Sequence, residues 1–215
     1  MPRYFFNVLL LVISISVPIG ISMQEDQTID LASVPAPTEV ESEASEEREP
    51  LTDIAGHWAE DSINNLYQTY VVNGYEDGSF GPNDPVTRWQ FLTIALRAFN
   101  YDTAGAEPAD FAYSVGIISD LDLWSNHGDD HVTRAEALKI LLNAGNLEVG
   151  ESLSPNFADV DIVNDWFALY SAFGMAQGIV TGDTEGNFNG LDNVTRAETC
   201  VLTLRIMERQ PSDVE

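Results

Sequence analysis

The sequence predicts a mainly α-helical fold built from three helix–loop–helix repeats, which follow an apolar N-terminal segment and an acidic linker. The tripeptide Val-Thr-Arg occurs three times, at 86–88, 132–134 and 194–196. Each copy opens a stretch with the apolar spacing of a helix, and each follows a loop rich in turn-forming residues. Similarity that recurs along a chain in this way marks an array of one supersecondary unit.

The N-terminal fifth of the chain differs from the rest. Residues 1–23 form an apolar run behind a basic start at Arg3, which is typical of a signal peptide and is also almost long enough for a membrane anchor. Both alternatives predict an exported protein. Residues 24–50 carry nine acidic residues against one arginine and few large apolar groups, which predicts a disordered acidic linker.

The repeats are expected at 51–101, 102–149 and 150–209. In each copy the threonine of the tripeptide is followed three residues later by Gln or Glu, the pattern of a helix-capping box. The pairs are Thr87 with Gln90, Thr133 with Glu136, and Thr195 with Glu198. Another helix is expected before each box, starting at about Trp58 in the first copy, with a turn-rich loop between the two helices.

Composition excludes several partner classes. The chain has 35 acidic and 9 basic residues, a formal net charge of −26. Binding to nucleic acid requires clustered Lys and Arg, so nucleic acid is excluded as a partner, and an anionic lipid surface is disfavoured. The single cysteine, Cys200, excludes an intramolecular disulfide. It aligns with leucines of the other copies and is expected to be a buried apolar residue.

The repeats resemble the S-layer homology (SLH) domain. In the first copy the residues that carry the resemblance are Asp53, His57-Trp58-Ala59, Gly74-Tyr75, Asp77-Gly78-Ser79-Phe80, Pro82-Asn83 and Val86-Thr87-Arg88. The third copy adds Phe157-Ala158-Asp159-Val160, Trp166, Gly178-Ile179-Val180 and Val194-Thr195-Arg196-Ala197-Glu198. The resemblance covers residues 51–208, and its motifs are several and occur in one order.

The sequence departs from the family pattern at two places. The middle repeat is degenerate: Ala104 stands where the tryptophan is expected and Phe99 where the aspartate falls, and Asp120 and Trp124 replace two glycines. The first box reads TRWQ where the family prefers TRAE, so bulky Trp89 follows its arginine.

The resemblance implies a compact, pseudo-threefold helical assembly of the three repeats. It also implies a protein without catalytic activity at the cell surface, in the cell wall or S-layer. Such a protein attaches non-covalently to a secondary cell wall polysaccharide or another peptidoglycan-linked polymer, which is often pyruvylated.

The residues support an anion-binding and sugar-binding chemistry. An arginine at a helix start lies beside free backbone N–H groups, and its planar guanidinium can hold a carboxylate through two parallel hydrogen bonds. Tryptophan faces suit sugar rings, aspartates accept hydrogen bonds from sugar hydroxyls, and glycines let the backbone approach a ligand. The predicted ligand-binding residues are Arg88, Arg134, Arg196, Asp53, Asp159, Trp58, Trp166, Gly74 and Gly182.

Each of these residues also has a structural interpretation. The arginines can pair with acidic residues of a neighbouring repeat and so hold the repeats together. The tryptophans can belong to the core, because aromatic residues dominate core burial. The two aspartates can cap the first helix of their repeats, and the glycines can serve turns.

Two alternatives to polysaccharide attachment remain. A structural surface-layer or scaffold protein would act by self-association or by binding surface-layer proteins, without a glycan site. An enzyme using carboxylates ranks last, because no catalytic constellation is visible and neither a cofactor nor a metal is expected. His127 and His131 have a spacing that suits zinc on a helix, but Gly128 and the turn-rich setting argue against a helix there.

Overall fold

The structure is a computed structural model that describes residues 48–150 and 157–209. The predicted signal peptide and residues 24–47 of the predicted linker lie outside the described residues. Chain contacts divide the protein between Ser45 and Glu46, so the described residues belong to one compact unit. None of its helices within these ranges has both the length and the apolar character that a bilayer crossing requires.

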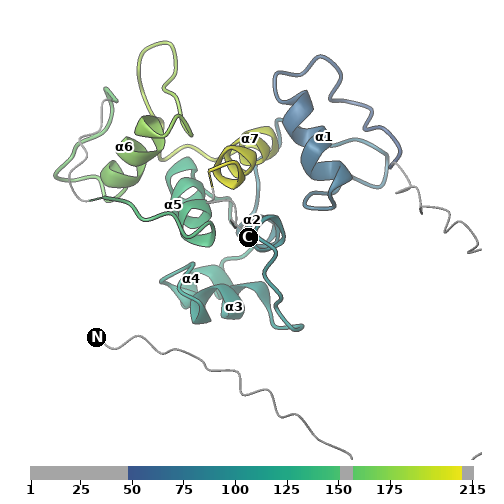
Figure 1. Ribbon diagram of the computed structural model, residues 1–215, viewed down its shortest axis with the longest axis horizontal. Helices are drawn as coiled ribbons and strands as arrows, with labels where there is room; N and C mark the ends of the chain where they lie inside the picture. Colours follow the sequence, from purple (N-terminus) through teal and green to yellow (C-terminus); the bar gives the residue numbers. More distant parts are fainter. Residues whose placement is uncertain (1–47, 151–156, 210–215) are drawn as a thin grey trace, which may run out of the picture. The chain divides into compact units, whose positions relative to one another are not determined.

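The predicted mainly α-helical class is confirmed. The described residues form seven helices and no strand, and the loops contribute only isolated β-bridges. The helices, labelled in Figure 1, are α1 (Glu60–Gln68), α2 (Arg88–Ala98), α3 (Pro108–Ser114), α4 (Leu121–Asn126), α5 (Arg134–Ala144), α6 (Ala168–Ala176) and α7 (Arg196–Met207).

Local sequence explains where three of these helices begin. All three predicted capping boxes are present, at the starts of α2, α5 and α7. In each box the threonine side chain accepts the N–H of the residue three positions on, and that residue's side chain accepts the threonine N–H. Each arginine of the Val-Thr-Arg tripeptide is therefore the first residue of a helix.

The middle repeat departs from the expected helix–loop–helix order. A short extra helix, α4, replaces part of its turn-rich loop. Its N-cap is Asp120, whose Oδ1 accepts the N–H of Leu123 at 3.0 Å, and its Trp124 is buried. These two residues replace glycines of the other copies. A capping aspartate and a large apolar anchor favour one helical turn where glycine favours an open turn.

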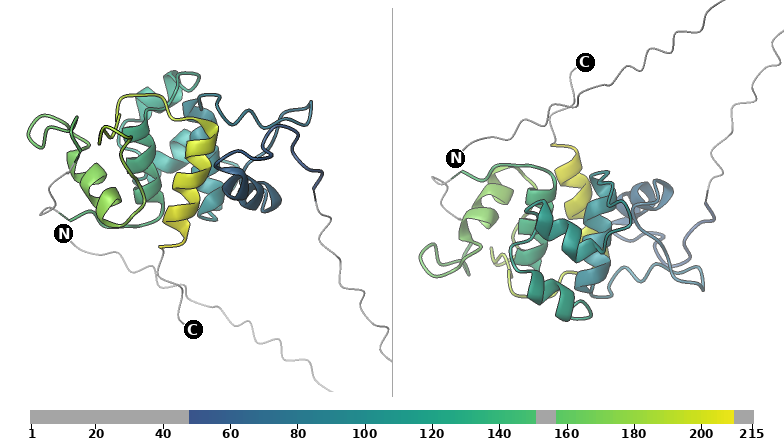
Figure 2. Two further views of the ribbon diagram at one scale, coloured as in Figure 1. Left: turned by 90° about the horizontal axis from the view of Figure 1, so that it is seen from above. Right: turned by 90° about the horizontal axis from the view of Figure 1, so that it is seen from below.

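The three boxed helices form the interior of the unit. Helices α2, α5 and α7 pack against one another, and each carries one outer helix: α3 packs on α2, α6 on α5 and α1 on α7 (Figure 1). Each outer helix therefore packs on the inner helix of a neighbouring repeat. In the views of Figure 2, α6 and α1 lie on opposite sides of the inner helices.

A closed cycle of backbone hydrogen bonds joins the starts of the inner helices. The N–H of Val86 donates to Val194, that of Val194 to Val132, and that of Val132 to Val86, at 3.2, 2.9 and 3.0 Å. All three valines are fully buried. A three-membered cycle made by equivalent residues is the arrangement that the expected pseudo-threefold assembly requires.

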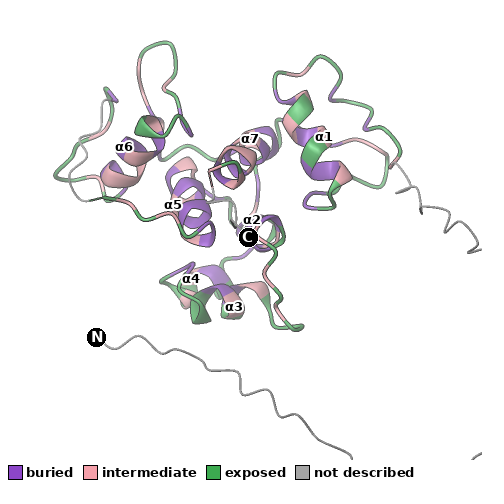
Figure 3. Ribbon diagram, viewed as in Figure 1, coloured by how far each residue is buried: buried purple, intermediate pink, exposed green. Residues whose placement is uncertain are grey.

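The apolar faces of the inner helices supply most of the core (Figure 3). The residues at helical apolar spacing are buried on α2 and α5: Phe91, Ile94, Ala95 and Ala98 on the first, and Leu138, Leu141 and Leu142 on the second. On α7 the buried face instead includes Thr199, Cys200, Thr203 and Ile206, while Val201 and Leu204 are half-buried. Cys200 is fully buried as expected, and burial raises the pKa of its thiol to about 12, so it stays protonated and unreactive at neutral pH.

Candidate functional site

The three arginines that open the inner helices occupy equivalent places between repeats. Each backbone N–H donates to a carbonyl of the loop before the next inner helix. The pairs are Arg88 with Asp130 at 2.9 Å, Arg134 with Asp192 at 2.8 Å, and Arg196 with Asp84 at 2.9 Å. The guanidinium partners come from that same neighbouring repeat, so each arginine side chain lies at a repeat junction.

Two of the three guanidinium groups are neutralised by a capping glutamate. Nη2 of Arg88 lies 3.3 Å from Oε1 of Glu136, and Nη1 of Arg134 lies 2.9 Å from Oε1 of Glu198. The other carboxylate oxygen of each glutamate accepts the N–H of its capping threonine at 2.9 Å. One carboxylate therefore closes a capping box and an ion pair between repeats. These two arginines therefore pair with acidic residues of a neighbouring repeat, which is their structural interpretation in the sequence.

Arg196 is the exception, because the residue at the corresponding place is the neutral Gln90. The Oε1 atom of Gln90 accepts the N–H of Thr87 at 3.1 Å, so the cap is complete without a carboxylate. Arg196 is only 8% exposed. Its Nε and Nη2 donate to the carbonyls of Phe80 and Asn73 at 2.8 and 2.7 Å. Within the described ranges no carboxylate forms an ion pair with it.

Aromatic rings complete the surroundings of Arg196. Its guanidinium carbon lies 4.3 Å from the ring centre of Phe80 and 5.0 Å from that of Tyr75. Cation–π contacts and carbonyl hydrogen bonds stabilise the charge without cancelling it. Tyr75 donates its hydroxyl to Oδ2 of Asp84 at 2.9 Å. Burial, followed by this hydrogen bond, raises the pKa of Tyr75, and the charge of Arg196 opposes that rise.

Arg196 lines a groove that we name the Gln90 groove, with a volume of about 400 Å³. Its lining contains two cationic residues and no acidic one: Val71, Val72, Asn73, Gly74, Tyr75, Trp89, Gln90, Thr93, Ile94, Arg97 and Arg196. The second cation, Arg97, is exposed. Its counterparts on α5 and α7, Asn143 and Arg205, donate to the carbonyls of Ile117 and Ile179. The Gln90 groove is therefore a positive site in a chain of strong negative charge.

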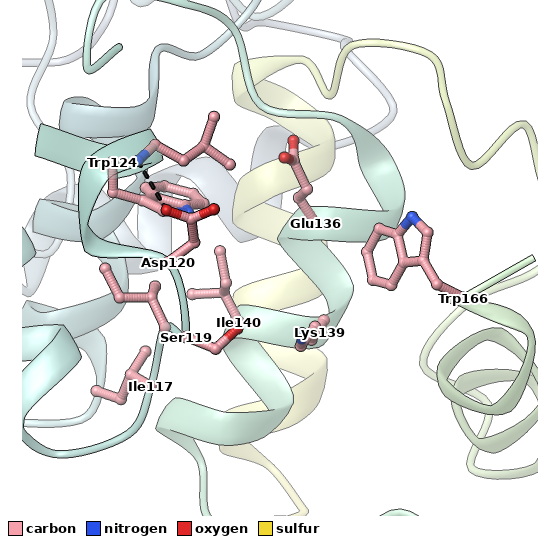
Figure 4. Close-up of a pocket in the computed structure, with 10 residues that line it drawn as sticks. Ile117, Ser119, Asp120, Trp124, Glu136, Lys139, Ile140 and Trp166 are labelled. Atoms are coloured by element: carbon pink, nitrogen blue, oxygen red, sulfur yellow. Dashed lines mark hydrogen bonds between the residues drawn. The ribbon is translucent and has the colours of Figure 1, made fainter. Parts of the chain in front are cut away.

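The other two grooves at equivalent places contain acidic residues. The groove beside Arg134, about 320 Å³, is lined by Asp183, Asp192 and Glu198 as well as the arginine. The middle groove, about 240 Å³, includes Asp120, Glu136 and Lys139 and is shown in Figure 4. Charge therefore distinguishes the Gln90 groove from both of its counterparts.

A hydrogen-bonded carboxylate organises the Arg134 groove. The Asn189 side chain, the Asn187 backbone N–H and further donors hold the pKa of Asp183 at about 2. Because the folded pKa lies below the ordinary value of 3.8, the hydrogen-bonded carboxylate stabilises the fold above about pH 4, and this stabilisation is lost as the pH falls toward 2.

We expect Asn189→Ala to raise the pKa of Asp183 in a carboxyl NMR titration, because the substitution removes one of the hydrogen bonds that stabilise the charged carboxylate. An unchanged pKa would show that Asn189 does not hold this carboxylate.

The predicted aspartates hold loops together. Asp53 accepts the N–H groups of Phe80 and Gly81 at 2.7 and 2.8 Å. Asp159 accepts those of Phe188 and Asn189 at 2.6 and 2.8 Å. The alternative that they cap the first helices is wrong, because neither α1 nor α6 has a side-chain cap. Both oxygens of each carboxylate already accept backbone hydrogen bonds.

The predicted glycines lie in grooves. Gly74 lines the Gln90 groove, and a Cβ atom there would lie 2.7 Å from Ser79 O and from Leu51 Cδ2. Gly182 lines the Arg134 groove, where a Cβ atom would lie 3.1 Å from the carbonyl carbon of Gly186. Close packing of the loop explains glycine at both places.

The interpretation of Trp58 and Trp166 as core residues is wrong. They are 66% and 51% exposed. Trp166 lines the middle groove, where Lys139 Nζ lies 5.4 Å from its ring centre (Figure 4). Trp58 lies beside His57 and lines none of the three grooves. Of the predicted ligand-binding residues, the structure brings Arg196 and Gly74 together in one groove and Arg134 and Gly182 together in another.

Three residues of the Gln90 groove were missed as site residues: Trp89, Gln90 and Arg97. The change from Ala-Glu to Trp-Gln after the arginine is visible in the sequence. Its consequence is not visible, because the arginine for which Gln90 provides no carboxylate is Arg196, at the opposite end of the repeat array. Arg97 gives no sequence signal, since it lies on a helix face of unremarkable pattern.

Comparison with known proteins agrees with this geometry. The family model of the S-layer homology domain matches residues 50–92 and 175–200. The first and third repeats belong to the S-layer homology family. The matched ranges include the loops and box of the first repeat and the loop and box of the third, so they contain Gln90 and Arg196, the two residues that distinguish the Gln90 groove.

Known relatives align with much of this chain but with little of their own length. An amylopullulanase of Thermoanaerobacterium thermosulfurigenes is 28% identical over 74% of the chain and 10% of its own length. Exoglucanase XynX of Acetivibrio thermocellus is 26% identical over 74% and 16%. The surface-layer 125 kDa protein of Lysinibacillus sphaericus is 27% identical over 70% and 14%. The chain therefore spans about a tenth to a sixth of these relatives.

Proposed function

We propose that this chain attaches non-covalently to the cell envelope by binding an acidic wall polysaccharide in the Gln90 groove. The observation that carries the proposal concerns Arg196, a buried cation that has no carboxylate partner among the described residues, at a place where both equivalent arginines have one. Burying a charge is unfavourable unless the charge is paired. A carboxylate on the ligand supplies the partner that Gln90 does not.

The groove suits a sugar that carries a carboxylate, such as a pyruvyl group. Arg196 and Arg97 line the same cavity, and a guanidinium can hold a carboxylate through two parallel hydrogen bonds. Asn73 and Gln90 are exposed, and their side-chain amide N–H groups can donate hydrogen bonds to the remaining hydroxyls. The surface-layer name of one relative supports a place at the cell surface for this chain as well.

The proposal assigns binding to one groove of the three. Arg88 and Arg134 already have carboxylate partners, and acidic residues line the middle groove and the Arg134 groove. A carboxylate ligand entering either of those grooves meets like charge, which is unfavourable at short distance. We therefore expect one ligand for each chain in calorimetric titration.

The test is co-sedimentation of the chain with isolated cell-wall sacculi, before and after chemical removal of acidic groups from the wall polymer. We expect binding to the intact sacculi, a large loss after this treatment, and weaker binding at higher salt because the contact is ionic. Equal binding to both wall preparations would contradict an anion site. Self-association without wall binding, measured by light scattering, would favour the structural scaffold instead.

A further inference from the structure

Trp89 is a large apolar residue at a position where the other two repeats have a small, buried residue. It is 51% exposed, whereas the corresponding Ala135 and Ala197 are fully buried. It follows Arg88 directly and precedes Gln90, so both unusual residues of the first box lie side by side. An exposed tryptophan at a charged groove requires an explanation that core packing does not provide.

The indole of Trp89 is held in a fixed position by the next repeat. Its backbone N–H donates to the carbonyl of Gly128 at 3.1 Å. A Cβ atom added to Gly128 would lie 2.0 Å from the indole Nε1, so the pyrrole half of the ring lies directly on the backbone of this glycine. A ring that is already fixed loses little conformational entropy when a ligand packs on it.

Trp89 lies between two cavities. Trp89 and Thr93 line both the Gln90 groove and a neighbouring cavity of about 550 Å³. The wall of the neighbouring cavity comes from the start of α3 and includes the exposed carboxylates of Glu107 and Asp110, together with Ser125. Its lining contains no cation. The two cavities therefore form one continuous surface that changes from positive to negative across Trp89.

We propose that Trp89 is the stacking platform of a second subsite, which binds the neutral sugar that follows the acidic unit of the wall polymer. This inference rests on the function proposed above. With the acidic unit held by Arg196, the next sugar ring lies on the indole face, and its hydroxyls donate to Glu107 and Asp110. The same carboxylates repel a second acidic sugar, so the charge change fixes the direction of the polymer along the surface.

The test compares ligands of increasing length by titration calorimetry on the full chain. The probes are the methyl glycoside of pyruvylated N-acetylmannosamine and the same unit extended by one neutral sugar. We expect the disaccharide to bind about tenfold more tightly than the monosaccharide, because stacking one ring on an aromatic side chain changes a dissociation constant by about this factor. Trp89→Ala, which introduces the residue found in the other two repeats, should abolish this gain, so that the two sugars bind the variant with equal affinity.

Two further variants make the result specific. Gly128→Ala displaces the indole without removing it and should reproduce the loss of the gain. Tyr113→Ala removes another exposed aromatic ring, on α3 but outside both cavities, and should leave the gain intact. A disaccharide gain that survives Trp89→Ala overturns the second subsite while the proposed function stands. Failure of the unaltered chain to bind either sugar overturns both.

Discussion

Replacing Gln90 by glutamate is expected to lower affinity for the acidic wall polymer by about 10- to 100-fold, the range of one hydrogen bond between charged groups. In the other two boxes one oxygen of the glutamate accepts the capping hydrogen bond, and the other pairs with the arginine of the preceding repeat. Glutamate at position 90 should do the same, keep the cap on Thr87 and pair with Arg196. The change removes no cation and neutralises one.

The measurement is titration calorimetry with the acidic monosaccharide, together with a urea unfolding curve. The folded state should be as stable as before or more so, which separates loss of binding from loss of fold. The matched control is Gln177→Glu, which makes the same chemical change at an exposed position after α6. Undiminished binding by the Gln90→Glu variant would refute Arg196 as the anion site.

Removing the equivalent glutamate of the middle repeat should have the largest effect on stability. Glu136→Ala removes the ion pair with Arg88 and the bonds to Thr133 at once. The side chain of Arg88 is only 10% exposed, and the remaining carboxylate, that of Asp130, is largely exposed and lies 3.4 Å away. Leaving a buried charge with so weak a partner costs about 3 kcal/mol of unfolding free energy. Urea denaturation of the full chain measures it.

Gln90→Ala is the matched control for this loss. It removes the equivalent capping side chain from a box whose residue at this place forms no ion pair. The free energy of unfolding should fall by about 1 kcal/mol. The difference between the two variants isolates the ion pair between repeats. Equal losses would show that Glu136 acts as a cap alone, and that the junction of the first and second repeats gains nothing from Arg88.

Features that depend on a few neighbouring residues were predictable. The capping boxes join residues three positions apart, and all three form. The buried stripes of α2 and α5 follow from helical spacing in the same way. The extra helix α4 was missed although its cause is local. Asp120 caps α4 and Trp124 anchors it in the core, and both stand where the other copies have glycine, so the sequence already contains the signal for this helix.

Features that join distant repeats were not predictable. Trp58 and Trp166 were expected in the core as one alternative, yet both are exposed, because each outer helix packs on the inner helix of another repeat. The same packing between repeats determines which glutamate lies beside which arginine. Arg88 and Glu136 lie 48 positions apart, and Arg134 and Glu198 lie 64 apart. No pattern within one repeat specifies these pairs.

The sequence alone is enough to predict the helical class, the three capped helices, the family resemblance and the recurrence of an arginine at each helix start. These depend on interactions within one turn of a helix and on similarity between copies. The neutralisation of two arginines, and not of Arg196, follows instead from the way the repeats pack together. The ring of repeats brings the third arginine to the first repeat, where a neutral glutamine takes the place of glutamate, and a charge is cancelled only by the residue that the fold places beside it.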